Sequence, residues 1–254
     1  MIKLWGSKGS DGNAVQPVKQ GAAAKRRRRL FLWNLAYKSC GLLILIAMIP
    51  AALGLLYRVE PIHPVSTLML ARWASGQKVD RRWVEIEDVA PIMVYSAIMS
   101  EDGQFCSHRG VDWAELNAVI DDALDGSATR GASTIPMQTA KNLFLWNGRS
   151  FLRKAMEIPL AFYLDGVLSK RRIMEIYLNI AEWDDGVFGV EAAARTYFGK
   201  SAADLTPRQA ALLAVTLPAP KARDPGRPAP GLQRLARLIE KRAAKSGGYV
   251  GCVR

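Results

Sequence analysis

The sequence predicts a mainly α-helical domain that follows a single transmembrane helix. The first supporting observation is an uncharged stretch, residues 39–57. As a helix it would be roughly 28 Å long and would match the hydrocarbon core of a bilayer. The second observation is that apolar residues recur at helical spacing from Val89 to Arg254, whereas alternating strand patterns are scarce. A chain of 254 residues is also long enough for one buried core with attachments.

Positive charge is concentrated ahead of the uncharged stretch. Residues 1–38 hold nine Lys or Arg against one acid, a net charge of +8, while the other 216 residues hold 26 basic and 22 acidic groups. A nucleic-acid-binding protein would spread basic groups over its folded face, so this class is disfavoured. The run at residues 25–29 instead predicts topology, with residues 1–29 in the cytoplasm and everything after about residue 58 outside.

Two alternatives to a membrane anchor remain for residues 39–57: a cleaved signal peptide and a buried core helix. A signal peptide usually has a shorter apolar region that starts nearer the N-terminus. Trp33, Tyr37 and Tyr57 flank the stretch where amphipathic rings favour the headgroup zone, and Pro50 is tolerated within a spanning helix. These features favour a spanning anchor. The Gly, Ser and Lys mixture of residues 1–24 predicts a disordered tail.

Local signals predict the elements that follow the anchor. Residues 58–88 are expected to form a juxtamembrane connector with one short helix, and residues 92–99 an apolar helix. Ser169 precedes a helix with apolar residues at positions 173, 176, 177 and 180, and Gly199 ends a helix that covers about residues 189–198. Thr206, Pro207 and Gln209 predict a capped helix that stops at Pro218.

The remaining C-terminal stretch is predicted to carry no site. Residues 218–230 are rich in Pro, Ala, Lys and Arg and are expected to be irregular, and residues 233–245 to form a basic surface helix. The predicted organisation is therefore a basic cytoplasmic tail (1–38), a transmembrane helix (39–57), the connector (58–88), a folded domain (89–220) and a basic C-terminal segment (221–254).

The three cysteines give little information. Cys40, Cys106 and Cys252 are far apart and stand in unlike contexts, so they predict neither a disulfide framework nor a metal site. The compartment of the protein cannot be read from them.

The first candidate site is the string SEDGQFCSHRGVDW, residues 100–113. Two adjacent carboxylates, Glu101 and Asp102, stand with an aromatic residue and a histidine in a stretch that contains two glycines. Such crowding is costly unless it has a function, because adjacent like charges repel each other. The structural alternative is that Glu101 ends one helix and Asp112 caps the next.

Two further candidate sites follow. In GASTIPMQTAKN, residues 131–142, Ser133 and Thr134 predict a helix start that could bind an anion, although hydroxyl residues are also common as plain caps. In RSFLRKAMEIP, residues 149–159, Arg153 and Lys154 lie one helical turn before Glu157 and form a net positive cluster. Such a cluster could hold a diphosphate.

Together these groups suit sugar transfer from a diphosphate carrier. Glu101 could accept the proton of an acceptor hydroxyl, and the cations could stabilise charge on the leaving phosphate. His63 and His108 are isolated, so no histidine metal cluster is predicted. The sequence contains no G-x-G-x-x-G, Walker or G-x-S-x-G motif, which lowers the case for nucleotide-binding and serine-hydrolase chemistry.

The ordered motifs resemble the peptidoglycan glycosyltransferases of family 51. They are ED-x-x-F-x-x-H-x-G-x-D, then G-x-STI-x-x-Q-x-x-KN, then RK-x-x-E, then K-x-x-I-x-E-x-YLN, followed by EAAARTYFGK, all between about residues 97 and 218. Within the family, the chain is similar to the monofunctional members that lack a penicillin-binding transpeptidase half. The resemblance implies a lysozyme-like head at residues 89–220, with a small membrane-associated jaw at about residues 110–150.

The resemblance implies roles for single residues. Glu101 would be the general base that takes the proton of the acceptor 4-hydroxyl, and Glu157 the second catalytic carboxylate, near the donor diphosphate. The implied diphosphate ligands are Lys141, Arg149, Arg153 and Lys154. The residues implied to shape and line the cleft are Asp102, Phe105, His108, Ser133, Thr134, Gln138 and Asn142. Glu175, Tyr177 and Asn179 are expected to be structural.

The resemblance also implies substrate and setting. The enzyme would polymerise lipid II into β-1,4-linked glycan strands with inversion at the sugar, assisted by a divalent cation (Mg or Mn) and by no organic cofactor. It would lie in the cell inner membrane as a single-pass protein with a periplasmic catalytic domain. Expected partners are lipid II, the growing strand and the membrane, with wall-synthesis or division proteins as further candidates and no nucleic acid.

Two points remain open at the level of sequence. Pro136 and Met137 stand where many family members have a hydroxyl residue and a glutamine, so altered cleft contacts are expected. The alternative functions are a lytic muramidase of similar fold and an anchored scaffold without enzymatic activity. The basic strip argues against the muramidase, because a neutral glycan has little use for four cations.

Overall fold

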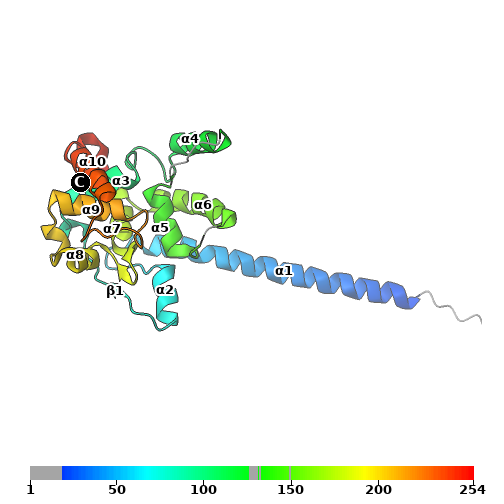
Figure 1. Cartoon of the computed structure of the whole chain (residues 1–254). Helices are drawn as coiled ribbons and strands as arrows, with labels where there is room; N and C mark the ends of the chain where they lie inside the picture. Colours follow the sequence, from blue (N-terminus) through cyan, green and yellow to red (C-terminus); the bar gives the residue numbers. More distant parts are fainter. Residues whose placement is uncertain (1–18, 126–130, 132, 149) are drawn as a thin grey trace, which may run out of the picture. The chain divides into compact units, whose positions relative to one another are not determined.

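The computed structural model describes residues 19–125, 131, 133–148 and 150–254 (Figure 1). The chain divides into two compact units, residues 1–49 and residues 50–254. Helix α1, Lys19–Leu56, runs through the first unit and ends in the second. The other helices belong to the second unit: α2 Thr67–Ala74, α3 Pro91–Glu101, α4 Trp113–Leu124, α5 Ile135–Phe144, α6 Phe151–Val167, α7 Lys170–Ile180, α8 Val190–Phe198, α9 Pro207–Thr216 and α10 Pro230–Ala244.

Helix α1 is long and apolar. A candidate membrane span covers Lys25–Leu56, and almost none of it is buried. Large apolar side chains such as Leu43 and Ile44 are more than half exposed. A core helix would bury such side chains, so the alternative of a buried core helix is disfavoured. The helix also extends further toward the N-terminus than predicted: residues 19–24 are helical, whereas residues 1–18 lie outside the described residues.

Helix α7 forms the centre of the helical head. Its last nine residues, Arg172 to Ile180, are all buried. Helices α5, α6 and α8 contact it, and α3, α9 and α10 pack against one another. The predicted apolar positions on this helix, Ile173, Ile176, Tyr177 and Ile180, therefore face the core as the periodicity requires.

Short polar contacts attach the connector to α7. The Asn179 side chain accepts a hydrogen bond from the Val84 amide (2.9 Å) and donates one to the Val84 carbonyl (2.8 Å). Glu175 accepts from the Ile86 amide (3.1 Å) and pairs with Arg172. The prediction that Glu175 and Asn179 are structural is confirmed.

Local capping signals were accurate guides to helix ends. Thr206 and Gln209 form the predicted capping box of α9, and Ser169 caps α7. Gly199 follows α8 at φ +63°, a left-handed conformation that favours glycine. Asp112 accepts from the Glu115 amide (3.1 Å) at the start of α4.

The described strands form one small sheet beside the helices. Strands β1 (Asp80–Arg81), β3 (Val187–Phe188) and β2 (Glu182–Asp184) lie in that order, with β1 parallel and β2 antiparallel to β3. The β2–β3 turn contains Gly186 at φ +79°, where a Cβ would stand 2.7 Å from the Lys78 carbonyl oxygen. Glycine is therefore required at this turn.

The region predicted as a jaw, residues 110–150, divides between two cores. Val111 and Met137 belong to a small cluster with Ala161, against which Leu116 of α4 packs. By contrast, Ile135 of α5 is buried in the main core. Helix α5 is thus part of the head, because it also packs against α6 and α7.

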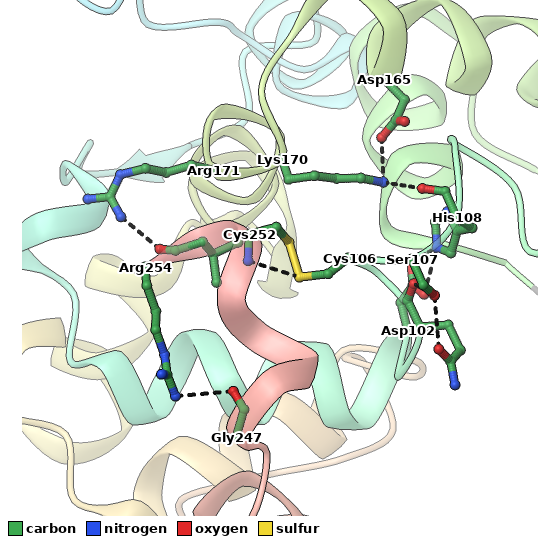
Figure 2. The surroundings of a disulfide bond; sticks show 12 residues. Asp102, Cys106, Ser107, His108, Asp165, Lys170, Arg171, Gly247, Cys252 and Arg254 are labelled. Carbon is green, nitrogen blue, oxygen red and sulfur yellow. Dashed lines mark hydrogen bonds and ion pairs between the residues drawn. A yellow bond between two sulfur atoms is a disulfide. The ribbon is translucent and has the colours of Figure 1, made fainter.

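Cys106 and Cys252 form a disulfide, which the sequence pattern did not reveal (Figure 2). The two residues are 146 positions apart, and their Cα atoms lie 5.5 Å apart. No local sequence signal reports a contact at such separation. The bond joins the 3₁₀ turn η3, Gly247–Val253, to the loop that follows α3.

Candidate active site

A cavity of about 950 Å³ opens between the end of α3 and the starts of α5 and α6. It contains both carboxylates that the sequence singles out, Glu101 and Glu157. The other predicted site residues that line it are Asp102, Ser133, Thr134, Gln138, Lys141, Arg153 and Lys154. Residues from three sequence motifs therefore meet in one cleft.

Glu101 is the last residue of α3 and is half-buried. Burial raises its pKa, and this effect is opposed by hydrogen bonds from Gln138 and Ser100 and by the positive charges of Arg223 and Lys141. The bond from Gln138 Nε2 to Glu101 Oε2 is 3.0 Å. A carboxyl with a raised pKa is a better proton acceptor once ionised, which suits a general base.

Tyr177 links the core to this carboxylate. Its hydroxyl donates to Gln138 Oε1 (3.2 Å), so the amide group of Gln138 directs its N–H toward Glu101. Burial raises the pKa of Tyr177 far above its ordinary value, so the phenol stays protonated and remains a donor. Tyr177 was expected to be structural, and this contact extends its influence to the site.

Asp102 builds the wall of the cleft. It is buried, accepts from the Ile135 amide at the start of α5 (2.9 Å), and pairs with His108 Nε2 (2.9 Å). Thr134 caps α5 and donates to the Gly110 carbonyl (2.6 Å). These bonds fix the loop after Glu101 to the first turn of α5.

The second carboxylate, Glu157, lies on α6 and is 3% exposed. Arg153 and Lys154, one turn earlier on the same helix, both pair with it, as their spacing predicts. Lys154 Nζ stands 2.9 Å from Glu157 and 2.6 Å from Ser133 Oγ. A buried carboxylate thus holds two cations in place at the cavity surface.

Lys141 lies on α5 and shares the cavity with both carboxylates. Burial lowers its pKa, the charge of Glu157 raises it, and Arg153 and Lys154 lower it further. Loss of hydration makes such a cation ready to bind an anion that replaces the missing water.

Some predicted site residues do not line the cavity. The described residues that line the cavity do not include Phe105, His108 or Asn142. Phe105 is fully buried in the main core, and Lys170 lies 4.8 Å from its ring centre. His108 pairs with the Asp102 carboxylate through Nε2. Lys170 donates to the backbone carbonyl of His108 (2.8 Å), as Figure 2 shows. Arg149 lies outside the described residues.

Pro136 and Met137 make no direct contribution to the described wall of the cavity. Both side chains are buried, and neither is among the described residues that line the cavity. Met137 packs with Val111 and Ala161 instead. An apolar residue there fills the small second core.

Sequence reasoning missed the C-terminal contribution to the site. Arg242 of α10 and Tyr249 of η3 line the same cavity as Glu101. The basic character of α10 predicted only a surface helix. The signal that could have located this segment was the disulfide partner of Cys106, which brings η3 to the loop after α3.

The site does not resemble a protein-built metal centre. Within the described residues no group of three or more His, Cys, Asp or Glu side chains could hold a metal ion. Glu157 already has two cationic partners. The residues present do not fit a metal site of their own.

This combination of fold and site defines a class: a mainly helical protein in which two carboxylates and a group of cations share one cleft. Comparison with known proteins identifies the family. Residues 67–244 match the family model described as Transglycosylase, which covers more than half of the chain. The chain therefore belongs to the transglycosylase family.

Named relatives agree with this membership. The chain is 59% identical over 230 residues to a biosynthetic peptidoglycan transglycosylase of Rhizobium meliloti (strain 1021), covering 91% of this chain and 93% of that protein. It is 63% identical over 209 residues to the protein of that name from Mesorhizobium japonicum, covering 82% and 89%. For that of Brucella suis biovar 1 the identity is 60% over 213 residues, covering 84% and 95%.

Family membership confirms the predicted class of fold and enzyme. The chain is a peptidoglycan transglycosylase of cell wall biosynthesis, with a mainly α, lysozyme-like head preceded by an apolar helix long enough to span a membrane.

Proposed function

We propose that the protein polymerises lipid II into β-1,4-linked glycan strands by inverting transfer from an undecaprenyl diphosphate donor. The observation that carries the proposal is the meeting of Glu101 with the cluster of Lys141, Arg153, Lys154 and Glu157 in one cavity. A base and a diphosphate-binding group are the two parts that this reaction needs.

In the proposed reaction, Glu101 takes the proton of the acceptor 4-hydroxyl. The hydroxyl oxygen then bonds to the anomeric carbon of the donor sugar from the face opposite the diphosphate. The bond between that carbon and the diphosphate oxygen breaks, and its electron pair leaves with undecaprenyl diphosphate. The α-linked donor thereby becomes a β-linked product, and the proton remains on Glu101 until solvent removes it.

The cations of α5 and α6 act on the leaving group. Charge builds on the diphosphate as the bond to the sugar breaks, and fixed cations stabilise that charge without having to reorganise. Ser133 and Glu157 hold Lys154 in position, at 2.6 and 2.9 Å. Glu157 therefore acts through Arg153 and Lys154 rather than on the sugar.

The divalent-ion requirement stays a prediction. Because the described residues offer no metal cluster, no step above depends on a metal ion. Activity of the purified protein in excess chelator measures whether an ion is needed at all.

We further propose that α1 anchors the protein in the inner membrane with the head outside the cytoplasm. The basic run at residues 25–29 favours a cytoplasmic N-terminus. The Cys106–Cys252 disulfide supports a head on the oxidising side, since disulfides are rare in the cytosol.

The test is an assay of the full-length protein in detergent with labelled lipid II, with products resolved by size. Long polymer that muramidase digests is the expected result, and moenomycin should suppress it if the resemblance extends to inhibition. Cleavage of preformed peptidoglycan without polymer formation would replace the proposal with the lytic alternative. Absence of both reactions would favour the scaffold alternative.

A further inference from the structure

The C-terminal turn η3 brings an exposed aromatic residue to the active-site cavity. Tyr249 lines this cavity together with Glu101, although the match to the family model ends at residue 244. Its side chain is 56% exposed. Among the described residues its hydroxyl has no hydrogen-bond partner, so the packing of the head gives no reason for a tyrosine here.

The turn is held firmly in this place. The disulfide fixes Cys252 to Cys106, and Val250 and Val253 are buried in the main core. Arg171 of α7 donates to the Val253 carbonyl (2.7 Å), so η3 is tied both to the loop that follows α3 and to the central helix α7 (Figure 2). The backbone at Tyr249 is therefore placed by its neighbours in the turn.

Two smaller hollows show on which side of the cavity Tyr249 lies. Both include Tyr249: one, of about 380 Å³, also includes Gly103 and Gln104, and the other, of about 360 Å³, includes Met99. Met99 lies two positions before Glu101, and Gly103 and Gln104 lie two and three positions after it. Of the groups proposed to bind the diphosphate, none lines either hollow in the described part of the chain. Tyr249 thus lies near the chain on either side of Glu101 and apart from Lys141, Arg153 and Lys154, while Lys241, Arg242 and Lys245 of the C-terminal segment share one of its hollows.

We propose that Tyr249 is a binding residue for the acceptor saccharide and that its ring packs against the face of a pyranose. The proposal rests on the proposed function, because Glu101 must receive the proton of the acceptor hydroxyl. The acceptor sugar then extends from Glu101 toward the side of the cavity that Tyr249 lines. Aromatic rings offer a large rigid surface to the apolar face of a sugar and still tolerate contact with water.

The test separates the two substrate sites with two lipid II analogues. A donor-only analogue carries a methyl group on its terminal 4-oxygen, and an acceptor-only analogue has its diphosphate replaced by a linkage that cannot leave. Single coupling of the two gives a KM for each. For Tyr249→Ala the acceptor KM should rise about three- to tenfold. The donor KM and kcat should stay unchanged, and Tyr249→Phe should keep the wild-type acceptor KM.

The matched control is Trp73→Ala, since Trp73 is similarly exposed (49%) and does not line the cavity. It should leave both constants unchanged. Wild-type protein that fails to couple the analogues contradicts the proposed function itself. Wild-type coupling with an unchanged acceptor KM in Tyr249→Ala overturns only the acceptor site, as does an equal rise in both KM values.

Discussion

At the scale of single residues, the site places two carboxylates in opposite surroundings. Glu101 has neutral donors, Gln138 and Ser100, as its hydrogen-bond partners, and burial raises its pKa. Glu157 is buried between two cations of its own helix. Two carboxyl groups in different environments can take different roles, and the roles we propose are a base for Glu101 and an anchor for cations for Glu157.

The hydrogen bond from Gln138 to Glu101 predicts how the catalytic activity depends on pH. This bond lowers the pKa of Glu101, so Gln138→Met should raise it further. The base works only when ionised. The acid side of the plot of kcat/KM against pH should therefore move to higher pH, while the alkaline plateau is retained.

Tyr177→Phe is the matched companion variant. It removes the donor that orients Gln138 and should move the profile in the same direction by less. A profile that stays in place in both variants would show that the amide does not tune the base.

The proposed role of Lys154 predicts a weaker use of the donor substrate when its charge is removed. Lys154→Met removes a charge-assisted contact of about 1.5–3 kcal/mol, so the KM of the donor-only analogue should rise roughly ten- to hundredfold. The KM of the acceptor-only analogue should not change. Lys200→Met, at an exposed lysine outside the cavity, is the control. Equal effects on donor and acceptor would argue against the diphosphate role.

At the scale of elements, chain segments distant in sequence build the cleft. Helix α3 ends at Glu101, α5 begins at the wall of the cleft and carries Lys141, and α6 carries Arg153 and Lys154. The disulfide adds η3 to this arrangement. Two hydrogen bonds join the start of α5 to the loop that follows Glu101: the Ile135 amide donates to Asp102, and Thr134 donates to the Gly110 carbonyl.

Local elements could be predicted from the sequence, and distant contacts could not. The capping box at Thr206 and the stop at Gly199 depend on residues within one turn, so a short string of letters contains the whole signal. The contact of Cys106 with Cys252 depends on the packing of the entire head.

The same distinction holds within the site. The pairs of Glu157 with Arg153 and Lys154 follow from helical spacing. The burial of Phe105 and the position of His108 behind Asp102 do not follow from a motif, because a motif does not tell which side of a loop faces the cavity.

The disulfide makes a prediction about stability. Cys252→Ser should lower the free energy of unfolding by about 2–5 kcal/mol, because the bond closes a long loop of the unfolded chain. Denaturant titrations with and without a thiol reductant measure this. Reductant should destabilise the wild type and leave Cys252→Ser unchanged.

Cys40 supplies the control, because it is the exposed free cysteine of the described chain. Cys40→Ser should behave as the wild type does. Detection of free thiols at positions 106 and 252 in the unreduced protein would contradict the assignment.

At the scale of the whole molecule, charge and redox chemistry agree on orientation. The basic run, residues 25–29, lies at the N-terminal end of the candidate span, and the disulfide lies beyond its C-terminal end. We therefore expect protease added to intact spheroplasts to digest the head and to leave an N-terminal fragment that ends near residue 57. A head that resists protease until the membrane is opened would reverse the proposed orientation.

The central claim is that Glu101 is the base in a cleft that binds a diphosphate-linked sugar. The most direct measurement compares Glu101→Gln with the wild type in single coupling of the two analogues, with donor binding measured separately. Removing a general base should lower the coupling rate about 10²–10⁴-fold. Donor binding should persist.

The fold of this variant should also persist. Burial raises the pKa of Glu101, so ionising it costs stability as pH rises above its ordinary range, and a neutral amide avoids that cost. The account predicts a folded variant that binds the donor and does not couple it. A Glu101→Gln protein that couples at the wild-type rate would contradict the account.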